Sequence, residues 1–105
     1  MSSKITLKST HLFLDKEVVT RLFSEVTHVY LFYHEGQHQI LITPVTSQWF
    51  KKMHKPEQYI LKARNLEGDK TIDIGGILID NDLDETDKEL EYEIIDKTEL
   101  LKITM

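Results

Sequence analysis

The pattern in this sequence that most resembles a chemical site is His-Glu-Gly-Gln-His at residues 34–38, which matches the H-E-x-x-H signature of zinc metalloproteases. In those enzymes an α-helix places both histidines on one face to bind zinc, and the glutamate acts as base on the metal-bound water. Here a glycine lies inside the motif, and β-rich runs flank it at residues 29–33 and 40–43. This context predicts a hairpin connection, which leaves a zinc-dependent hydrolase as the third-ranked hypothesis.

An acidic segment at residues 80–84 resembles the start of an EF-hand calcium loop, and Glu91 falls at the twelfth loop position. The sixth position, where that loop needs glycine for its sharp turn, is Glu85. The residues after Glu91 alternate as in a strand, whereas an EF-hand continues into a helix. We predict a solvated acidic loop, and leave open whether residues 80–89 bind a divalent ion.

A basic and aromatic segment could stack bases and neutralise phosphates. Its aromatic residues Trp49 and Phe50, with Met53, share one face of a short predicted helix that Pro56 ends, and the lysines lie opposite them. This spacing is typical of a core face with a solvated face behind it. The candidate interaction surface consists of Trp49, Lys51, Lys52, Lys55, Lys62 and Arg64.

Other catalytic chemistry has little support in the sequence. There is no cysteine, so thiolate nucleophiles, cysteine metal sites and disulfides are excluded. No serine lies in a G-x-S-x-G elbow, and Gly75-Gly76 is not part of a phosphate-binding loop. We therefore assign no catalytic residue, no metal ligand and no cofactor, and the sequence favours a protein that is not an enzyme.

The elements that would position these residues alternate between strands and two helices. Asp15 is expected to cap a helix over about residues 16–25 whose apolar face includes Val18, Leu22 and Phe23. Extended runs are predicted within residues 5–14 and at 29–33, 40–43, 59–63, 71–74, 77–79, 90–94 and 101–105. A bulge is predicted at Gly75-Gly76.

These elements predict a single α+β domain, residues 1–105, with a mainly antiparallel or mixed sheet. We expect about six to seven strands, with two short helices packed on one face. No repeat recurs at a fixed period.

The charge is unevenly distributed along the chain. Residues 1–66 hold nine Lys and Arg against five Asp and Glu, a net of +4, whereas residues 67–105 hold four against thirteen, a net of −9. The total of −5 argues against general nucleic-acid affinity. The absence of cysteine, of a signal-like start and of a long apolar run predicts a cytoplasmic protein that does not span a membrane.

The stretch from residue 64 to residue 105 resembles swapped-hairpin transcription factors of the AbrB and MraZ type. The resemblance lies in a turn, an Ile-Leu-Ile-Asp strand, an acidic connection and a final hairpin. The glycine-arginine-apolar-x-proline core of that pattern is missing. The resemblance implies a small DNA-binding regulator. In such a regulator the basic residues Lys51, Lys52, Lys55, Lys62 and Arg64 would contact phosphates.

Our first hypothesis is instead a non-enzymatic protein-interaction or assembly module. Its expected partner is itself, as a homo-oligomer and most simply a dimer, or another protein. The DNA-binding regulator is the alternative. The hypothesis of self-association rests on the separated charges and on a last strand, residues 100–105, that was expected to be a lightly guarded sheet edge.

Overall fold

The computed structural model describes residues 4–23, 26–45, 49, 52, 57–63 and 69–105. One nine-stranded sheet has the order β5-β3-β4-β9-β8-β1-β2-β7-β6, and all its pairings are antiparallel. The strands are β1 (Lys4–Lys8), β2 (His11–Leu14), β3 (His28–His34), β4 (Gln39–Pro44), β5 (Glu57–Ile60), β6 (Lys62–Ala63), β7 (Lys70–Asp73), β8 (Lys88–Ile95) and β9 (Leu100–Thr104). The helical elements are α1 (Lys16–Leu22), α3 (Gly75–Asp80) and the 3-10 turns η1 (Glu35–Gln37) and η2 (Asp96–Thr98).

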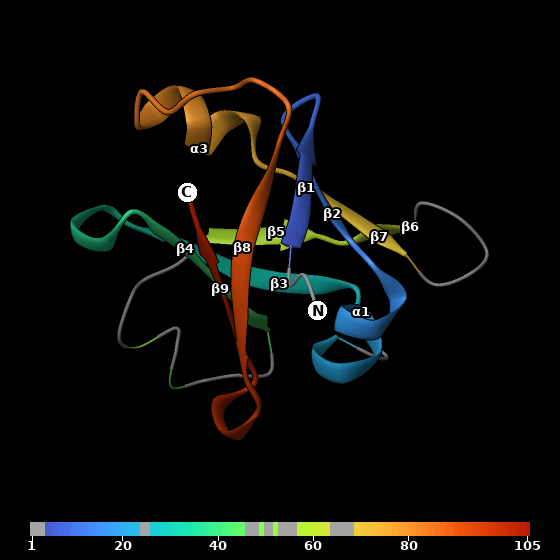
Figure 1. Ribbon diagram of the computed structural model, residues 1–105. Helices are drawn as coiled ribbons and strands as arrows, with labels where there is room; N and C mark the ends of the chain where they lie inside the picture. The colour runs from blue at the N-terminus through green and yellow to red at the C-terminus, as the bar shows by residue number, and fades with distance from the viewer. Residues whose placement is uncertain (1–3, 24–25, 46–48, 50–51, 53–56, 64–68) are drawn as a thin grey trace.

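The two ends of this sheet meet, and the sheet curls into a nearly closed barrel (Figure 1). Only Leu61 separates β5 from β6; β5 pairs with β3, and β6 pairs with β7. The Leu61 amide donates to the Thr27 carbonyl at 2.9 Å, which extends the ladder with β3 through the bend. Counted as one bent strand, β5 and β6 make an eight-stranded barrel. The antiparallel α+β prediction is confirmed, but the predicted strand number is wrong.

The last strand is not a sheet edge, contrary to expectation. β9 lies between β4 and β8 and pairs with both along its length. Its backbone groups are therefore already used in the ladder, and the expected strand pairing between copies through residues 100–105 loses its basis.

Alternating side chains fill the barrel interior. The inward positions are aliphatic on almost every strand, and many of these side chains are completely inaccessible to solvent. The fully inaccessible members on strands are Leu7, Leu12, Val29, Ile40, Ile42, Ile72, Leu101 and Ile103. Among the described residues the middle of the barrel is filled by side chains, so a ligand is expected to bind on the surface or where an end of the barrel opens.

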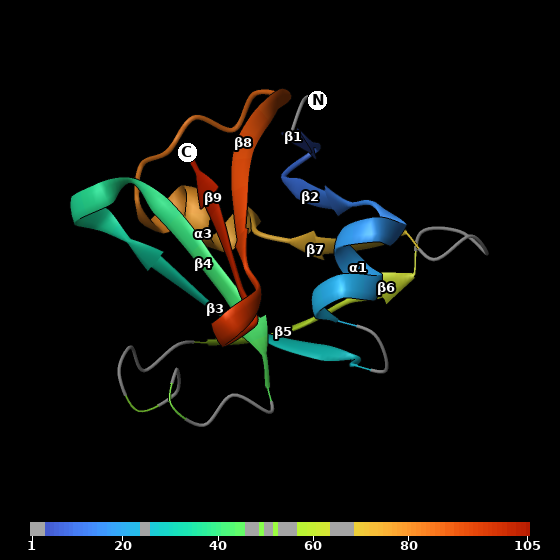
Figure 2. The same cartoon turned by 60° about the horizontal axis from the view of Figure 1, so that its bottom comes forward.

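Helix α1 forms where the sequence predicts it. The Asp15 carboxylate accepts from the Val18 amide at 3.0 Å and caps the first turn. Val18, Leu22 and Phe23 are buried, which confirms the predicted apolar face, although the helix ends at Leu22 and not at residue 25. α3, which the sequence did not predict as a helix, lies on a different side of the barrel from α1 (Figures 1 and 2). The second predicted helix, around Trp49, lies mostly outside the described residues, so the placement of the two predicted helices on one face stays a prediction.

Helix α3 replaces the strand predicted at residues 77–79 and the bulge at Gly75-Gly76. The alternating Ile77 and Ile79 suggested a strand, but Leu78 is the fully buried residue and Ile79 is 67% exposed. Gly75, the first residue of α3, lies close to the β1–β2 turn: a Cβ there would lie 3.2 Å from both Thr10 Oγ1 and Asp73 Oδ1. The glycine permits this close approach, and the chain turns into a helix after it.

The barrel is built from two similar halves, which no sequence repeat had indicated. The first half runs β1, β2, α1, β3 and β4; the second runs β5/β6, β7, α3, β8 and β9. Equivalent strands meet in two places, since β2 pairs with β7 and β4 pairs with β9. The remaining contacts between halves match as well, because β1 pairs with β8 in the same way that β5 pairs with β3.

Each half gives its second hairpin to the other half. The β3–β4 hairpin pairs only with β5 and β9, and the β8–β9 hairpin pairs only with β1 and β4. Both hairpins turn through a 3-10 turn followed by a left-handed residue, His38 (φ 52°, ψ 48°) or Glu99 (φ 50°, ψ 47°). The Ile-Leu-Ile-Asp strand on which the swapped-hairpin resemblance rested is instead the end of helix α3.

The two adjacent glycines of α3 should respond oppositely to alanine. Gly75→Ala would force its Cβ against Thr10 and Asp73, so we expect a loss of roughly 1–3 kcal/mol in the free energy of unfolding. Gly76 has nothing within 4 Å of its Cβ position, so Gly76→Ala should gain roughly 0.5–1 kcal/mol by reducing chain entropy. Urea unfolding of both variants measures this difference, and equal effects would contradict the close approach.

Candidate functional site

The metalloprotease-like segment forms the β3–β4 hairpin loop, as its context predicted. His34 ends β3, residues 35–37 form η1, and the His38 amide donates to the Glu35 carbonyl at 3.3 Å. His34 is paired with Gln39 across the ladder. Because the segment is a tight turn and not an α-helix, it lacks the backbone on which the zinc-protease geometry depends.

The two histidine rings of this loop have separate surroundings. The His34 ring packs edge-on against Phe32, with ring centroids 6.3 Å apart, and its Nδ1 is buried without a hydrogen-bond partner. The His38 ring instead lies with Nδ1 3.3 Å from the Tyr33 hydroxyl. Among the described residues, no three His, Asp or Glu side chains are grouped so as to hold a metal ion.

The basic and aromatic surface can be followed only in part. Trp49 and Lys52 have helical backbone, and Trp49 is 37% exposed, so it is not a core residue. Lys62 is exposed on the short strand β6. The remaining residues of the predicted surface, Lys51, Lys55 and Arg64, lie outside the described residues, as does most of the short helix predicted around Trp49.

The acidic segment connects α3 to β8. Hydrogen bonds from the Thr86 amide and hydroxyl lower the pKa of the Asp84 carboxyl, and Lys88 Nζ lies 3.7 Å from it. A strand begins at Lys88 where an EF-hand would continue into a helix. The segment is therefore a turn stabilised by its own side chains, which agrees with the predicted solvated acidic loop.

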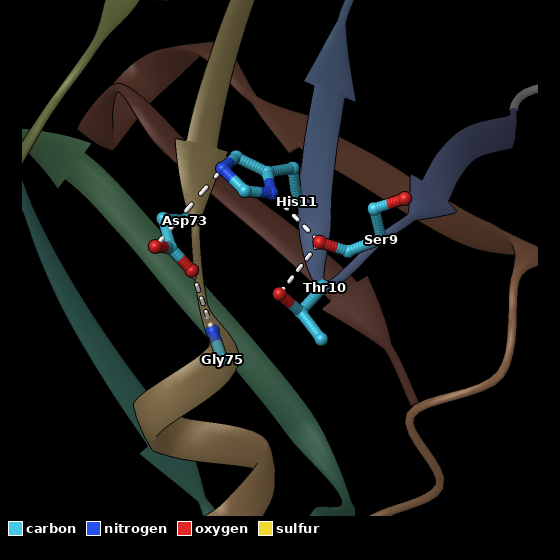
Figure 3. Close-up of polar contacts among 5 residues, drawn as sticks. All are labelled: Ser9, Thr10, His11, Asp73 and Gly75. Atoms are coloured by element: carbon cyan, nitrogen blue, oxygen red, sulfur yellow. Dashed lines mark hydrogen bonds and ion pairs between the residues drawn. The ribbon is translucent and has the colours of Figure 1, made fainter.

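A polar cluster joins the β1–β2 turn to the start of α3 (Figure 3). His11 Nδ1 lies 2.8 Å from the Ser9 carbonyl oxygen, and its Nε2 lies 4.0 Å from the Asp73 carboxylate. The other Asp73 oxygen accepts from the Gly75 amide at 2.9 Å. Ser9 and Thr10 both have positive φ, 51° and 63°, as the two residues of a type I′ hairpin turn require.

This His–Asp pair resembles part of a catalytic triad, but its geometry is structural. A general base needs one ring nitrogen facing a nucleophile while the other is held by an orienting group. Here the Ser9 carbonyl faces one nitrogen of His11 and Asp73 faces the other. Asp73 also binds the first amide of α3. The cluster thus holds the β1–β2 turn close to Gly75 at the start of α3.

A cavity that the sequence did not reveal lies between β3, β5 and α3. Its volume is about 260 Å³, and Tyr59 and Glu57 of β5 line it together with Asp80 at the end of α3. The Tyr59 hydroxyl donates to Glu57 Oε2 at 3.3 Å. Burial raises the pKa of the Tyr59 phenol to about 12, and the carboxylates of Glu57 and Asp80 act in the same direction. Its residues come from segments that only the barrel brings together.

No protein-family model, no curated protein and no solved structure matches this chain. In the part of the chain that the structure describes, no helix has both the length and the apolar character needed to cross a membrane. The functional argument therefore depends on the surfaces of the barrel itself.

The Tyr59 environment predicts a specific alkaline titration. Its folded pKa of about 12 exceeds the ordinary value of 10.0, so folding favours the protonated phenol; this stabilisation is present below pH 10 and is lost as the pH rises toward 12. We expect the ¹³Cζ resonance of Tyr59 to titrate near pH 12, and nearer 10 in Glu57→Gln. A wild-type midpoint near 10 would contradict the burial and the contact with Glu57.

Proposed function

We propose that this chain is a cytoplasmic, non-enzymatic interaction module that associates with a second copy of itself. Supporting the proposal, the barrel interior is filled, and the polar cluster that most resembles a catalytic set is committed to structure. The cysteine-free composition agrees with a reducing compartment. The observation that carries the proposal is a second apolar cluster on the outside of the barrel.

The outer apolar face spans β3, β4 and β9. Tyr30, Leu41 and Leu100 are buried at 6–8% exposure, separately from the main core. Phe32, Val45 and Ile95 pack against them and are partly accessible. Tyr30, Leu41 and Leu100 are already covered within one chain, so the partly accessible Phe32, Val45 and Ile95 are the members of this outer face that a second copy would cover.

Ile60 extends this outer face toward β5. Its neighbour Tyr59 lines the cavity on the inner side, and strand alternation directs Ile60 outward, where it is 54% exposed. Ile60 pairs with His28, two residues before Tyr30 on β3. A self-complementary contact between two such patches gives a two-fold dimer, which is the commonest closed assembly.

Charge contributes less to this contact than the sequence implied. The acidic strand β8 lies between β1 and β9, and the register places Glu93 opposite Lys102. Opposite charges on neighbouring strands compensate each other within one chain. Self-association through the outer apolar face is therefore expected to depend little on salt.

Two exposed isoleucines provide a matched test of the interface. Ile60→Lys places a charge on the outer apolar face and should weaken the dimer by at least about tenfold, because burying an unpaired ammonium is costly. Ile79→Lys changes an even more exposed isoleucine on α3 and should have no effect. Light scattering over a protein concentration series measures both. A monomeric wild type at every concentration, or equal weakening by both variants, would sink the proposal.

DNA binding is the second candidate, supported by the exchange of hairpins between the two halves. A module with two similar halves would contact a DNA duplex through equivalent surfaces on each half. In the first half, His11 at the start of β2 and Lys16 at the start of α1 would face the phosphates. At the equivalent places the second half carries Gly76 and Thr71, followed by the acids Asp73 and Asp80. This acidic counterpart makes phosphate contact less favourable than self-association.

A gel shift with random-sequence duplex separates the two functions. The proposed module should give no shift at about 50 mM salt, where phosphate contacts are strongest. A shift that weakens steeply toward about 200 mM salt, and that Lys62→Glu removes, would instead establish nucleic-acid binding.

A further inference from the structure

The cavity between β3, β5 and α3 has a distinctive chemical lining. Leu31 of β3 and Ile77 of α3 supply apolar surface, and Tyr33 and Tyr59 line it from the two neighbouring strands. Its rim carries Glu57, Asp80 and Asn81. Among the residues that the structure describes, those that line this cavity include no lysine, arginine or histidine.

The polar groups of this cavity are arranged as hydrogen-bond acceptors. Asn81 Nδ2 donates to the Ile77 carbonyl at 2.9 Å, which leaves the side-chain carbonyl oxygen to accept. The Tyr59 proton is directed to Glu57, so the second Glu57 oxygen and the Asp80 carboxylate also remain acceptors. A complementary ligand must therefore donate several hydrogen bonds and carry positive charge.

An organic cation fits this lining better than a metal ion does. A divalent metal needs several oxygen ligands converging on one point, and the described residues contain no such group of three acids or histidines. Aromatic rings and aliphatic walls suit an ammonium group on a short carbon chain, because the rings attract the cation and the walls cover the chain. A primary ammonium supplies three donors to the acceptors of the rim.

The other half of the barrel supplies its own cation at the corresponding side. Arg21 follows the buried Val18 of α1 by three residues, as Asn81 follows the buried Leu78 of α3. Arg21 is close enough to Tyr92 of β8 to offset part of the rise in the pKa of that phenol, and it pairs with Asp96. On the α3 side the described residues provide acids and tyrosines without an equivalent arginine.

We propose that the cavity between β3, β5 and α3 binds a primary alkylammonium group. The ammonium lies between Glu57, Asp80 and the Asn81 carbonyl oxygen, and the alkyl chain lies against Leu31 and Ile77. A free alkylamine and a lysine side chain of a partner share this chemistry. The site lies on the inner side of β5, so it does not depend on the self-association proposed for the outer apolar face.

A titration followed by ¹H–¹⁵N NMR tests the site with n-butylammonium chloride, with sodium chloride at the same ionic strength as reference. Saturable shifts should be confined to Leu31, Tyr33, Tyr59, Ile77 and Asn81. The double variant Glu57→Gln, Asp80→Asn should weaken binding at least about tenfold. Tetramethylammonium, which has no N–H donor, should bind several-fold more weakly than butylammonium.

The matched control is the double variant Glu91→Gln, Glu93→Gln, which likewise removes two negative charges but from β8, away from the cavity, and should leave the affinity unchanged. Shifts that do not saturate, or equal weakening by the two double variants, would overturn the proposal, since either result means general charge attraction. Nα-acetyl-lysine methylamide distinguishes the two sources: affinity equal to that of butylammonium supports a lysine side chain, and weaker affinity supports a free amine. The spectrum of each variant also reports whether it folds.

Discussion

Closure of the sheet at Leu61 is the constraint on which the rest of this structure depends. By turning at one buried residue, the chain lets β5 pair with β3 and β6 pair with β7, which joins the two ends of the sheet. A closed sheet leaves few unpaired backbone groups and requires the buried inward side chains to be mainly apolar. The largely aliphatic core, from Leu7 to Ile103, follows from that requirement.

Closure also explains why the two halves cannot be separated. Each second hairpin obtains its backbone partners from the other half, so neither half has a complete set of hydrogen bonds alone. The helices then pack at different sides of the barrel, each after the strand pair of its own half (Figure 2). Gly75 shows how tightly the elements meet, because α3 begins in contact with the β1–β2 turn of the first half.

A filled interior moves the functional question to the surface. On the outside, apolar side chains of β3, β4 and β9 form a second cluster, and Ile60 is exposed on the outward side of the neighbouring strand β5. On the inner side of β5, next to α3, tyrosines and acids face a cavity whose described lining contains no lysine, arginine or histidine. These two surfaces share the strand β5, whose alternate residues Tyr59 and Ile60 face opposite ways.

The sequence by itself determined the elements whose signals are local. Asp15 and the apolar spacing after it specify α1, and the β-rich runs around residues 34–38 specify a hairpin in place of a metal-binding helix. The runs at residues 90–94 and 101–105 likewise predicted β8 and β9. These features depend on capping, periodicity and turn chemistry within a few residues.

Only the tertiary structure decided what depends on distant contacts. Residues 77–79 alternate like a strand, but in the fold they form helix α3, which begins where Gly75 closely approaches Thr10 of the β1–β2 turn. The two halves share inward alternation without shared residue identities, so their structural similarity leaves no repeat in the sequence. The cavity joins residues 57–59 to residues 77–81, because barrel closure brings β5 beside α3. A local sequence pattern does not predict which distant segments lie side by side, because pairing between them depends on the whole fold.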